Sequence, residues 1–394
     1  MKNNPVKILI TIGAFAAFFL FGFLDNLKGP VIPFVIKELK INYALMSIVL
    51  FLEYAAFLAA TIMAGVCIFR FGLKTVLLAA LVLLFLGLAV PAGIPVYWVL
   101  SAAFLALGLG LGTLEITCNS TIVLLHSENK GKLLNLLGSF HGVGSMLAPL
   151  YAGALLSTHI SWRIAFAICL IPILILLLYL TLIKFPKPGP DNAEGLFALA
   201  KSAFSREMIW HYIAICFYVA VEIGLATWIV EYTYKIKGQS FFYSTISLSV
   251  FFGLITGGRL LGGFFVDKIG HLRILFLAAT GALVSLMIGI YGPDYLAVFL
   301  PFTGLFFSII FPTITASFTD IQKPEIGKYL GFLFTFAGIG GMIGPWLIGV
   351  FGDLIQLTNS ISILIGYALI MFTAIVVLLF LKNGPKETED LNRI

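Results

Sequence analysis

The sequence predicts an all-α integral membrane protein whose twelve transmembrane helices form two six-helix pseudo-repeats. Three observations support this fold class. Hydrophobic residues make up 60% of the 394-residue chain and charged residues only 11%, whereas a soluble domain carries about 25% charged residues. The apolar residues gather in about twelve runs, each long enough to cross a bilayer as a helix. One loop pattern also occurs twice, at corresponding places in the two halves of the chain.

The predicted spans follow one another with short polar connections. The first six cover roughly residues 8–37, 43–69, 73–93, 96–126, 132–157 and 162–184, and the second six roughly 207–234, 241–266, 272–292, 294–319, 326–352 and 358–381. The first run is longer than the apolar core of a cleavable signal peptide, so we expect it to remain as a span. The segment between the two sets is the richest in Pro and charge, which is typical of a linker.

We therefore expect an N-terminal bundle at residues 1–184, a cytoplasmic linker at 185–206, a C-terminal bundle at 207–382 and a short tail at 383–394. Loops that follow even-numbered spans carry more Lys and Arg than the loops on the other side. By the positive-inside rule, both termini face the cytoplasm, and the protein is a multi-pass protein of the plasma (inner) membrane. Topology thus explains the net charge of +6, and we expect no nucleic-acid partner.

Glu115 is the carboxylate that the sequence pattern singles out most clearly. It lies near the middle of the fourth apolar run, where a charge is costly unless it faces a partner, a water-filled cavity or a ligand. Asn119 follows one helical turn later on the same face. Gly108 and Gly112 are also one turn apart and allow another helix to come close. This stretch therefore predicts a polar binding site inside the membrane.

Other charges lie at membrane depth, and two interpretations of them stay open. Asp25 and Lys28 can pair along one face of the first span, with Glu53 of the second span at a similar depth. Asp25 either binds or couples an ion, or it balances Lys28, and Glu53 either joins the site or neutralises Lys28. Lys28 is itself a candidate contact for a solute. For Arg259 in the eighth span, we favour a structural contact, either an ion pair with Asp267 or a bond to a carbonyl at a helix end, over solute contact.

Several polar side chains are candidates for contact with a small solute. His141 lies inside the fifth span and either binds solute hydroxyl groups or is a core histidine. Tyr218 and Glu222 share one face of the seventh span. Trp228 either stacks on a solute or lies in the interfacial aromatic belt. Asn26, next to Asp25, is included among the candidate contacts.

The repeated loop pattern consists of Gly, four residues, a basic residue, one residue, Gly and then a further basic residue. It occurs at residues 65–74 and 263–273, after the second and eighth spans, as expected for parallel repeats. The pattern resembles the loop signature of the major facilitator superfamily, in which an acid precedes the first basic residue. The second copy keeps this acid, whereas Phe69 replaces it in the first. The resemblance implies structural or gating roles for Arg70, Asp267 and Lys268.

Short motifs at residues 114–119, 134–144, 217–219, 308–314 and 338–341 together are similar to the fucose–proton symporter branch of this superfamily, which also includes sodium-linked glucose transporters. The resemblance implies sugar uptake coupled to an ion, with one carboxylate in span one and another in span four. Glu115 falls on the span-four position. If Pro33 is aligned with the proline of the branch, Gly29 takes the span-one acid position, and Asp25 lies one helical turn away.

We therefore expect a secondary active transporter that carries a monosaccharide or similar small polar solute by ion-coupled symport and alternating access. The alternative is a proton-coupled efflux carrier for an amphiphilic or anionic compound. An enzyme is not expected, because a single His at membrane depth supplies no nucleophile–base or metal set. We expect a monomer in the lipid bilayer, with a small polar solute, a sugar, as its partner. No metal or cofactor is expected beyond the coupling ion, H⁺ or Na⁺.

Overall fold

The computed structural model describes residues 5–126, 128–185, 204–321 and 329–383. The helices of the first half are α1 (Pro5–Leu39), α2 (Tyr43–Phe71), α3 (Leu73–Gly93), α4 (Tyr97–Leu125), α5 (Lys130–Leu156) and α6 (Trp162–Leu182). Those of the second half are α7 (Arg206–Lys235), α8 (Phe241–Ile269), α9 (His271–Tyr291), α10 (Phe299–Thr319), α11 (Leu330–Ile355), α12 (Leu357–Ser360) and α13 (Ile363–Asn383), with the 3₁₀ helix η2 (Asp294–Val298) before α10.

Twelve helical segments within these ranges are long and apolar enough to cross a membrane, and α12 and α13 together supply the last. This confirms the expected all-α fold with twelve spans. Most of the predicted linker and most of the predicted tail lie outside the described residues.

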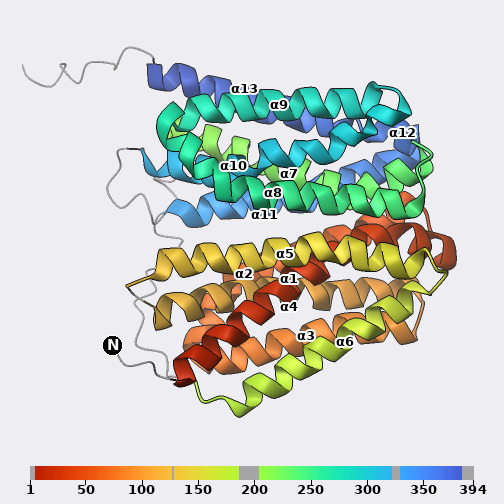
Figure 1. Ribbon diagram of the computed structural model, residues 1–394, viewed down its shortest axis with the longest axis vertical. Coiled ribbons are helices and arrows are strands. Elements are labelled where there is room, and N and C mark those ends of the chain that lie inside the picture. The colour runs from red at the N-terminus through yellow and green to blue at the C-terminus, as the bar shows by residue number, and fades with distance from the viewer. Residues whose placement is uncertain (1–4, 127, 186–203, 322–328, 384–394) are drawn as a thin grey trace, which may run out of the picture.

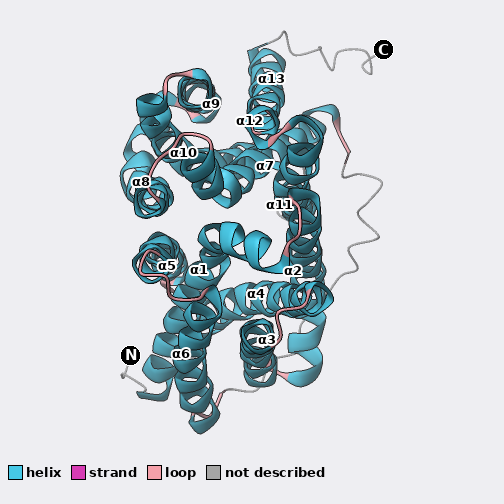
Figure 2. Cartoon of the chain, turned by 90° about the vertical axis from the view of Figure 1, so that its right-hand side faces the viewer, coloured by secondary structure: helices cyan, strands magenta, loops and turns pink. Residues whose placement is uncertain are grey.

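The helices of the two halves pack in the same pattern (Figure 1). In the first half α1 packs against α5 and α2 against α4, and in the second half α7 packs against α11 and α8 against α10. Across the halves, α2 packs against α11 and α5 packs against α8. Because α2 corresponds to α8 and α5 to α11, these two contacts are equivalent under the repeat. Figure 2 shows the two groups of helices stacked along the long axis. The fold is therefore a pair of parallel repeats.

The repeated sequence pattern forms a repeated turn. Gly72 ends α2 with φ 82°, and Gly270 ends α8 with φ 88°. Each donates its backbone N–H to a carbonyl of the last helical turn, at 2.8 Å for Gly72 and 2.9 Å for Gly270. Positive φ favours glycine, so the pattern requires glycine here. Arg70 and Lys268 are exposed beside these turns, whereas the side chain of Asp267 lies outside the described part of the structure.

Glycines bring α4 into backbone contact with α2. A Cβ atom on Gly108 would collide with the carbonyl oxygen of Glu53, and one on Gly112 would collide with the carbonyl oxygen of Phe57. The expected close approach at these glycines is thus confirmed, and its partner is α2. The contact fixes the backbone of Glu53 next to the helix that carries Glu115.

Hydrogen bonds join the two halves at one end of the molecule. We call the end where α1 begins and α13 ends the terminal face, and the other end the opposite face (Figure 1). At the opposite face, the Asp353 carboxylate of α11 accepts hydrogen bonds from the backbone N–H groups of Tyr43 (3.1 Å) and Ala44 (2.7 Å) at the start of α2. The Tyr43 hydroxyl donates to the Glu231 carboxylate of α7 at 2.9 Å. These contacts close the opposite face.

Candidate functional site

Four of the candidate side chains come together between the halves. Asp25 of α1 lies close enough to Glu115 of α4, His141 of α5 and Glu222 of α7 to interact electrostatically with each of them. All four residues lie near the middle of their helices. The structure therefore gathers polar groups from both halves at the depth where a bilayer is most apolar.

Lys28 binds two carboxylates at once. Its Nζ atom lies 2.7 Å from Asp25 Oδ1 and 2.9 Å from Glu53 Oε1, and 4.2 Å from the centre of the Tyr54 ring. The side chains of Lys28, Glu53 and Asp25 are 5%, 1% and 15% exposed. Both pairings that the sequence left open are therefore present. The second oxygen of Glu53, Oε2, is buried and has no hydrogen-bond partner among the residues that the structure describes, which is rare for a buried polar atom.

Glu115 differs from this cluster because no cationic side chain of the described residues pairs with its carboxyl group. Among the described residues, none forms a hydrogen bond or salt bridge with its carboxyl oxygens, and the side chain is half-buried. Asn119 is one turn further along α4, where its amide donates to the backbone carbonyl of Glu115 at 2.9 Å. The carboxyl of Glu115 and the oxygen of Asn119 are thus free to bind a ligand.

Asn26 and His141 lie at the contact between α1 and α5. The Asn26 amide nitrogen donates to the Gly22 carbonyl and to the Ser145 hydroxyl oxygen, both at 2.9 Å, and Asn26 is buried. The bond to Gly22 lies within α1, whereas the bond to Ser145 holds α1 against α5. His141 is half-buried, with its ring edge against Phe21 at 4.5 Å between ring centres. Both residues also face the second half: His141 interacts electrostatically with Arg259 of α8, and Asn26 borders a small cavity next to Thr227 of α7.

Arg259 of α8 lies near Tyr218 and Glu222, the two residues of α7 that were predicted to contact a solute. The fully buried Tyr218 donates its hydroxyl to the Phe307 carbonyl at 3.0 Å and lies beside the side chains of Glu222 and Arg259. Glu222 is half-buried, whereas Arg259 is exposed and interacts electrostatically with Glu222 and His141. Sequence reasoning missed this placement, because the spacing along α8 carries no signal of what α7 and α5 bring near it.

Trp228 is part of the closure at the opposite face. Its side chain is fully buried, its indole N–H donates to the Pro345 carbonyl at 2.9 Å, and its ring meets Tyr43 edge-on at 5.6 Å. In this state the ring is covered by α11 and α2. The structure thus places Trp228 between the halves rather than at the protein surface.

Gly29 allows α1 to lie directly on the backbone of α7. A Cβ atom at Gly29 would lie 3.0 Å from the Ala226 carbonyl oxygen and 3.3 Å from that of Thr227. A small cavity of about 10 Å³ remains next to it, bordered by Asp25, Lys28 and Thr227. This volume is about that of one water molecule. If Pro33 is aligned with the proline of the related branch, a helix contact takes the span-one acid position here.

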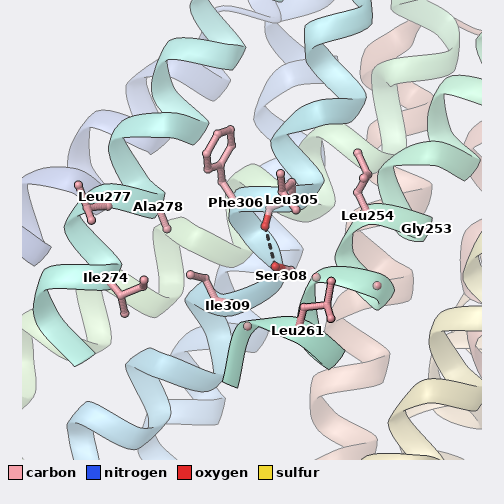
Figure 3. Close-up of a pocket in the computed structure, with 13 residues that line it drawn as sticks. Gly253, Leu254, Leu261, Ile274, Leu277, Ala278, Leu305, Phe306, Ser308 and Ile309 are labelled. Carbon is pink, nitrogen blue, oxygen red and sulfur yellow. Dashed lines mark hydrogen bonds between the residues drawn. The ribbon is translucent and has the colours of Figure 1, made fainter. Parts of the chain in front are cut away.

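A second cavity, of about 490 Å³, lies away from these charges (Figure 3). It is bordered by α8, α9 and α10, with Leu261, Leu277 and Ile309 among its side chains. Its hydroxyl group, that of Ser308, already donates to the Leu305 carbonyl at 2.6 Å. Because the lining is apolar and its one hydroxyl is engaged, this cavity does not suit a polar solute.

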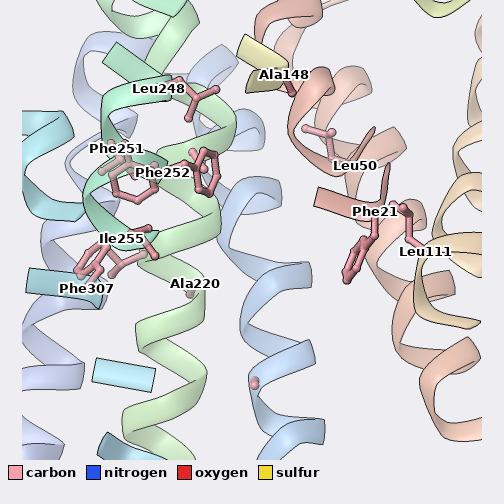
Figure 4. Close-up of a cluster of buried hydrophobic side chains, with 14 of the residues drawn as sticks. Phe21, Leu50, Leu111, Ala148, Ala220, Leu248, Phe251, Phe252, Ile255 and Phe307 are labelled. Carbon is pink, nitrogen blue, oxygen red and sulfur yellow. The ribbon is translucent and has the colours of Figure 1, made fainter. Parts of the chain in front are cut away.

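The buried apolar core takes side chains from both halves and includes Leu24 and Leu27, which flank Asp25 and Lys28 in the sequence of α1. Figure 4 shows Phe21, Leu50 and Leu111 of the first half and Phe251, Phe252 and Phe307 of the second. Such surroundings strengthen electrostatic interactions, because they lower the effective dielectric constant. The charges of Asp25, Lys28 and Glu53 therefore interact more strongly than they would at a wet surface.

The comparisons with known proteins agree with this architecture. The chain is 24% identical over 394 residues to a putative glucose/galactose transporter of Helicobacter pylori, with 95% of this chain and 96% of that protein covered. It is 25% identical over 379 residues to a glucose/galactose transporter of Brucella abortus, with 91% and 92% covered. The crystal structure of the fucose:proton symporter of E. coli superposes with a TM-score of 0.63 at 20% identity, covering 94% of this chain and 99% of that one.

These similarities confirm the resemblance that the sequence motifs indicated. Residues 14–299 match the model of the Major Facilitator Superfamily, which is well over half of the chain. The protein is therefore a member of the Major Facilitator Superfamily.

Proposed function

We propose that this protein is a secondary transporter that takes up a monosaccharide by ion-coupled symport. The observation that carries the proposal is the Glu115 carboxyl group, which lies in the middle of a spanning helix, half-buried and without a charged partner among the described residues. An ionisable group in this setting marks an ion or substrate pathway. The relatives named as glucose/galactose transporters, and the neighbour titled a fucose:proton symporter, support the solute class and the coupling.

The polar groups on Glu115's own helix and near Asp25 suit a neutral polyol. Asn119 supplies an amide oxygen, and His141, Glu222 and Arg259 supply a ring nitrogen, a carboxylate and a guanidinium group from three other helices. A sugar hydroxyl both donates and accepts hydrogen bonds, so a mixed set of donors and acceptors matches several hydroxyls at once. An amphiphilic compound would leave these groups unpaired, which costs binding free energy.

Alternating access follows from the contacts between the halves. The opposite face is closed by the bonds of Asp353 and Tyr43 described above. In the proposed cycle, these contacts break when the halves rock, so that the central site opens to the opposite face. The positive-inside rule assigns the terminal face to the cytoplasm. The structure then corresponds to a state closed toward the outside.

Transport assays in proteoliposomes test the proposal. The purified protein is reconstituted, and counterflow of radiolabelled glucose, galactose, fucose and a dicarboxylate is measured with and without inward H⁺ or Na⁺ gradients. The proposal predicts exchange of at least one sugar, and its accumulation above equilibrium with one of the two gradients. Exchange of the dicarboxylate but of none of the sugars would overturn it and assign Arg259 to an anionic solute.

A further inference from the structure

The ammonium group of Lys28 occupies a position that suits a bound monovalent cation. It lies between the carboxylates of Asp25 and Glu53, at 2.7 and 2.9 Å, with the face of Tyr54 on a third side at 4.2 Å. Carboxylate oxygens are the usual protein ligands of hard cations, and aromatic faces attract cations. The three groups are almost fully shielded from solvent.

We propose that Lys28 is a tethered cation that permanently fills a cation site formed by Asp25 and Glu53. On this account, neither carboxylate takes up the coupling ion, and Glu115 alone does so. Removal of the ammonium group opens the site to Na⁺. The part of the inference that concerns coupling rests on the proposed function, whereas the cation site itself does not.

The buried oxygen Glu53 Oε2 is the second observation that points to a cation. Glu53 is 1% exposed, yet Oε2 has no hydrogen-bond partner in the described part of the chain. The cavity of about 10 Å³ beside Asp25, Lys28 and Tyr54 leaves room for about one water-sized ligand. Two carboxylates, one of them with an unused buried oxygen, thus surround the ammonium group, and a water-sized space borders Asp25 and Lys28 beside them. These are groups that a small cation could use in place of the ammonium.

The position of the cluster in the fold keeps the ammonium in place during transport. Lys28 and Asp25 belong to α1 and Glu53 to α2, so all three move with the first half when the halves rock. Among the described residues, the other titratable groups that interact with Asp25 include Glu115 on α4, His141 on α5 and Glu222 on α7. None of the three is a Lys or Arg that would compete with Lys28 for the two carboxylates.

Counting bound Na⁺ tests the inference without a transport assay. Purified wild type and Lys28→Ala in lipid nanodiscs are titrated with ²²Na⁺ in choline buffer, in the absence of sugar. Lys28→Ala is expected to bind about one Na⁺ more per protein than wild type, and methylammonium, which mimics the lost group, should displace it. The additional ion should be absent from Lys28→Ala/Glu53→Gln. Lys237→Ala is the matched control, because Lys237 is also buried but bonds to the carbonyls of Ile290 and Gly292.

Equal Na⁺ binding by folded Lys28→Ala and wild type would overturn the inference, as would an additional ion that survives Glu53→Gln. If Lys28→Ala folds poorly in choline, the inference predicts recovery in Na⁺ or methylammonium buffer. Failure to recover there, together with a folded Lys28→Met that binds no additional Na⁺, also overturns it. Because this assay uses no sugar, failure of sugar transport would refute the proposed function but leave the cation site standing.

Discussion

Replacing Asp353 with Ser is expected to weaken the closure of the opposite face. Asp353 accepts the N–H groups of Tyr43 and Ala44, while Asn42 caps the same helix through Leu45 N–H at 2.9 Å. Loss of a helix N-terminal cap costs about 0.5–2 kcal/mol, and a carboxylate at a helix N-terminus contributes about 0.3–1 kcal/mol. Since Asp353 is exposed, we expect Asp353→Ser to destabilise the closed state by about 1.4 kcal/mol. This change raises the population of the open state about tenfold.

The labelling rate of a buried cysteine measures this population. Ser47 of α2 is fully buried under Gly349 of α11 when the face is closed, so Ser47→Cys reacts with a polar maleimide only when the face opens. In nanodiscs, Asp353→Ser should raise this rate about tenfold. Asp294→Asn is the control, because Asp294 is an exposed acid on the same face that pairs within the second half. An unchanged rate in folded Asp353→Ser, or an equal rise in the control, would refute the reasoning.

Three other outcomes are expected. Gly29→Asp should abolish exchange and speed labelling at the opposite face, because its side chain would press on the α7 backbone; normal exchange would contradict this contact. Gly72→Ala should lower the melting temperature, since its φ of 82° costs about 1–3 kcal/mol for other residues, whereas Gly65→Ala, with open space around it, should not. Burial lowers the pKa of His126, so this side chain takes up a proton less readily in the folded state than in the unfolded state. The contact of His126 with Thr11 therefore stabilises the fold at pH values above the unfolded pKa of about 6.5, and this stabilisation decreases as the pH falls below that value. The melting-temperature difference between wild type and His126→Asn should narrow as pH falls, and a widening difference would contradict this.

The twelve spans and the central carboxylates were predictable because the membrane imposes a simple rule. A run of apolar residues long enough to cross the bilayer is predicted to be a helix, and a carboxylate inside such a run is recognised as a candidate functional residue. Glu115 and Asp25 were found in this way, and the structure brings them together. The turn that ends both α2 and α8 was also predictable, because a positive φ favours glycine and the repeated glycine is visible in the sequence.

The contacts between the halves were not predictable from the chain. Asp353 and Tyr43 lie at helix ends, where acidic and aromatic residues are common for many reasons. Trp228 looked like a solute or interface residue, but its surroundings come from α2 and α11. The nearness of Arg259 to Glu222 and His141 was not foreseen, because sequence distance shows neighbours along a helix and not those across the bundle. Its expected pairing with Asp267 remains a prediction, because the side chain of Asp267 lies outside the described part of the structure. These residues gain their roles only from tertiary packing.

The most direct test of the central claim compares Glu115→Gln with wild type in proteoliposomes, using the sugar that exchanges best. Glutamine keeps the shape of the side chain but cannot carry a charge that a proton or Na⁺ neutralises. The account predicts that Glu115→Gln loses accumulation against a gradient while sugar exchange persists, and that Glu128→Gln, an exposed acid outside the spans, behaves as wild type. Gradient-driven accumulation by Glu115→Gln at the wild-type level would contradict the claim that Glu115 carries the coupling ion.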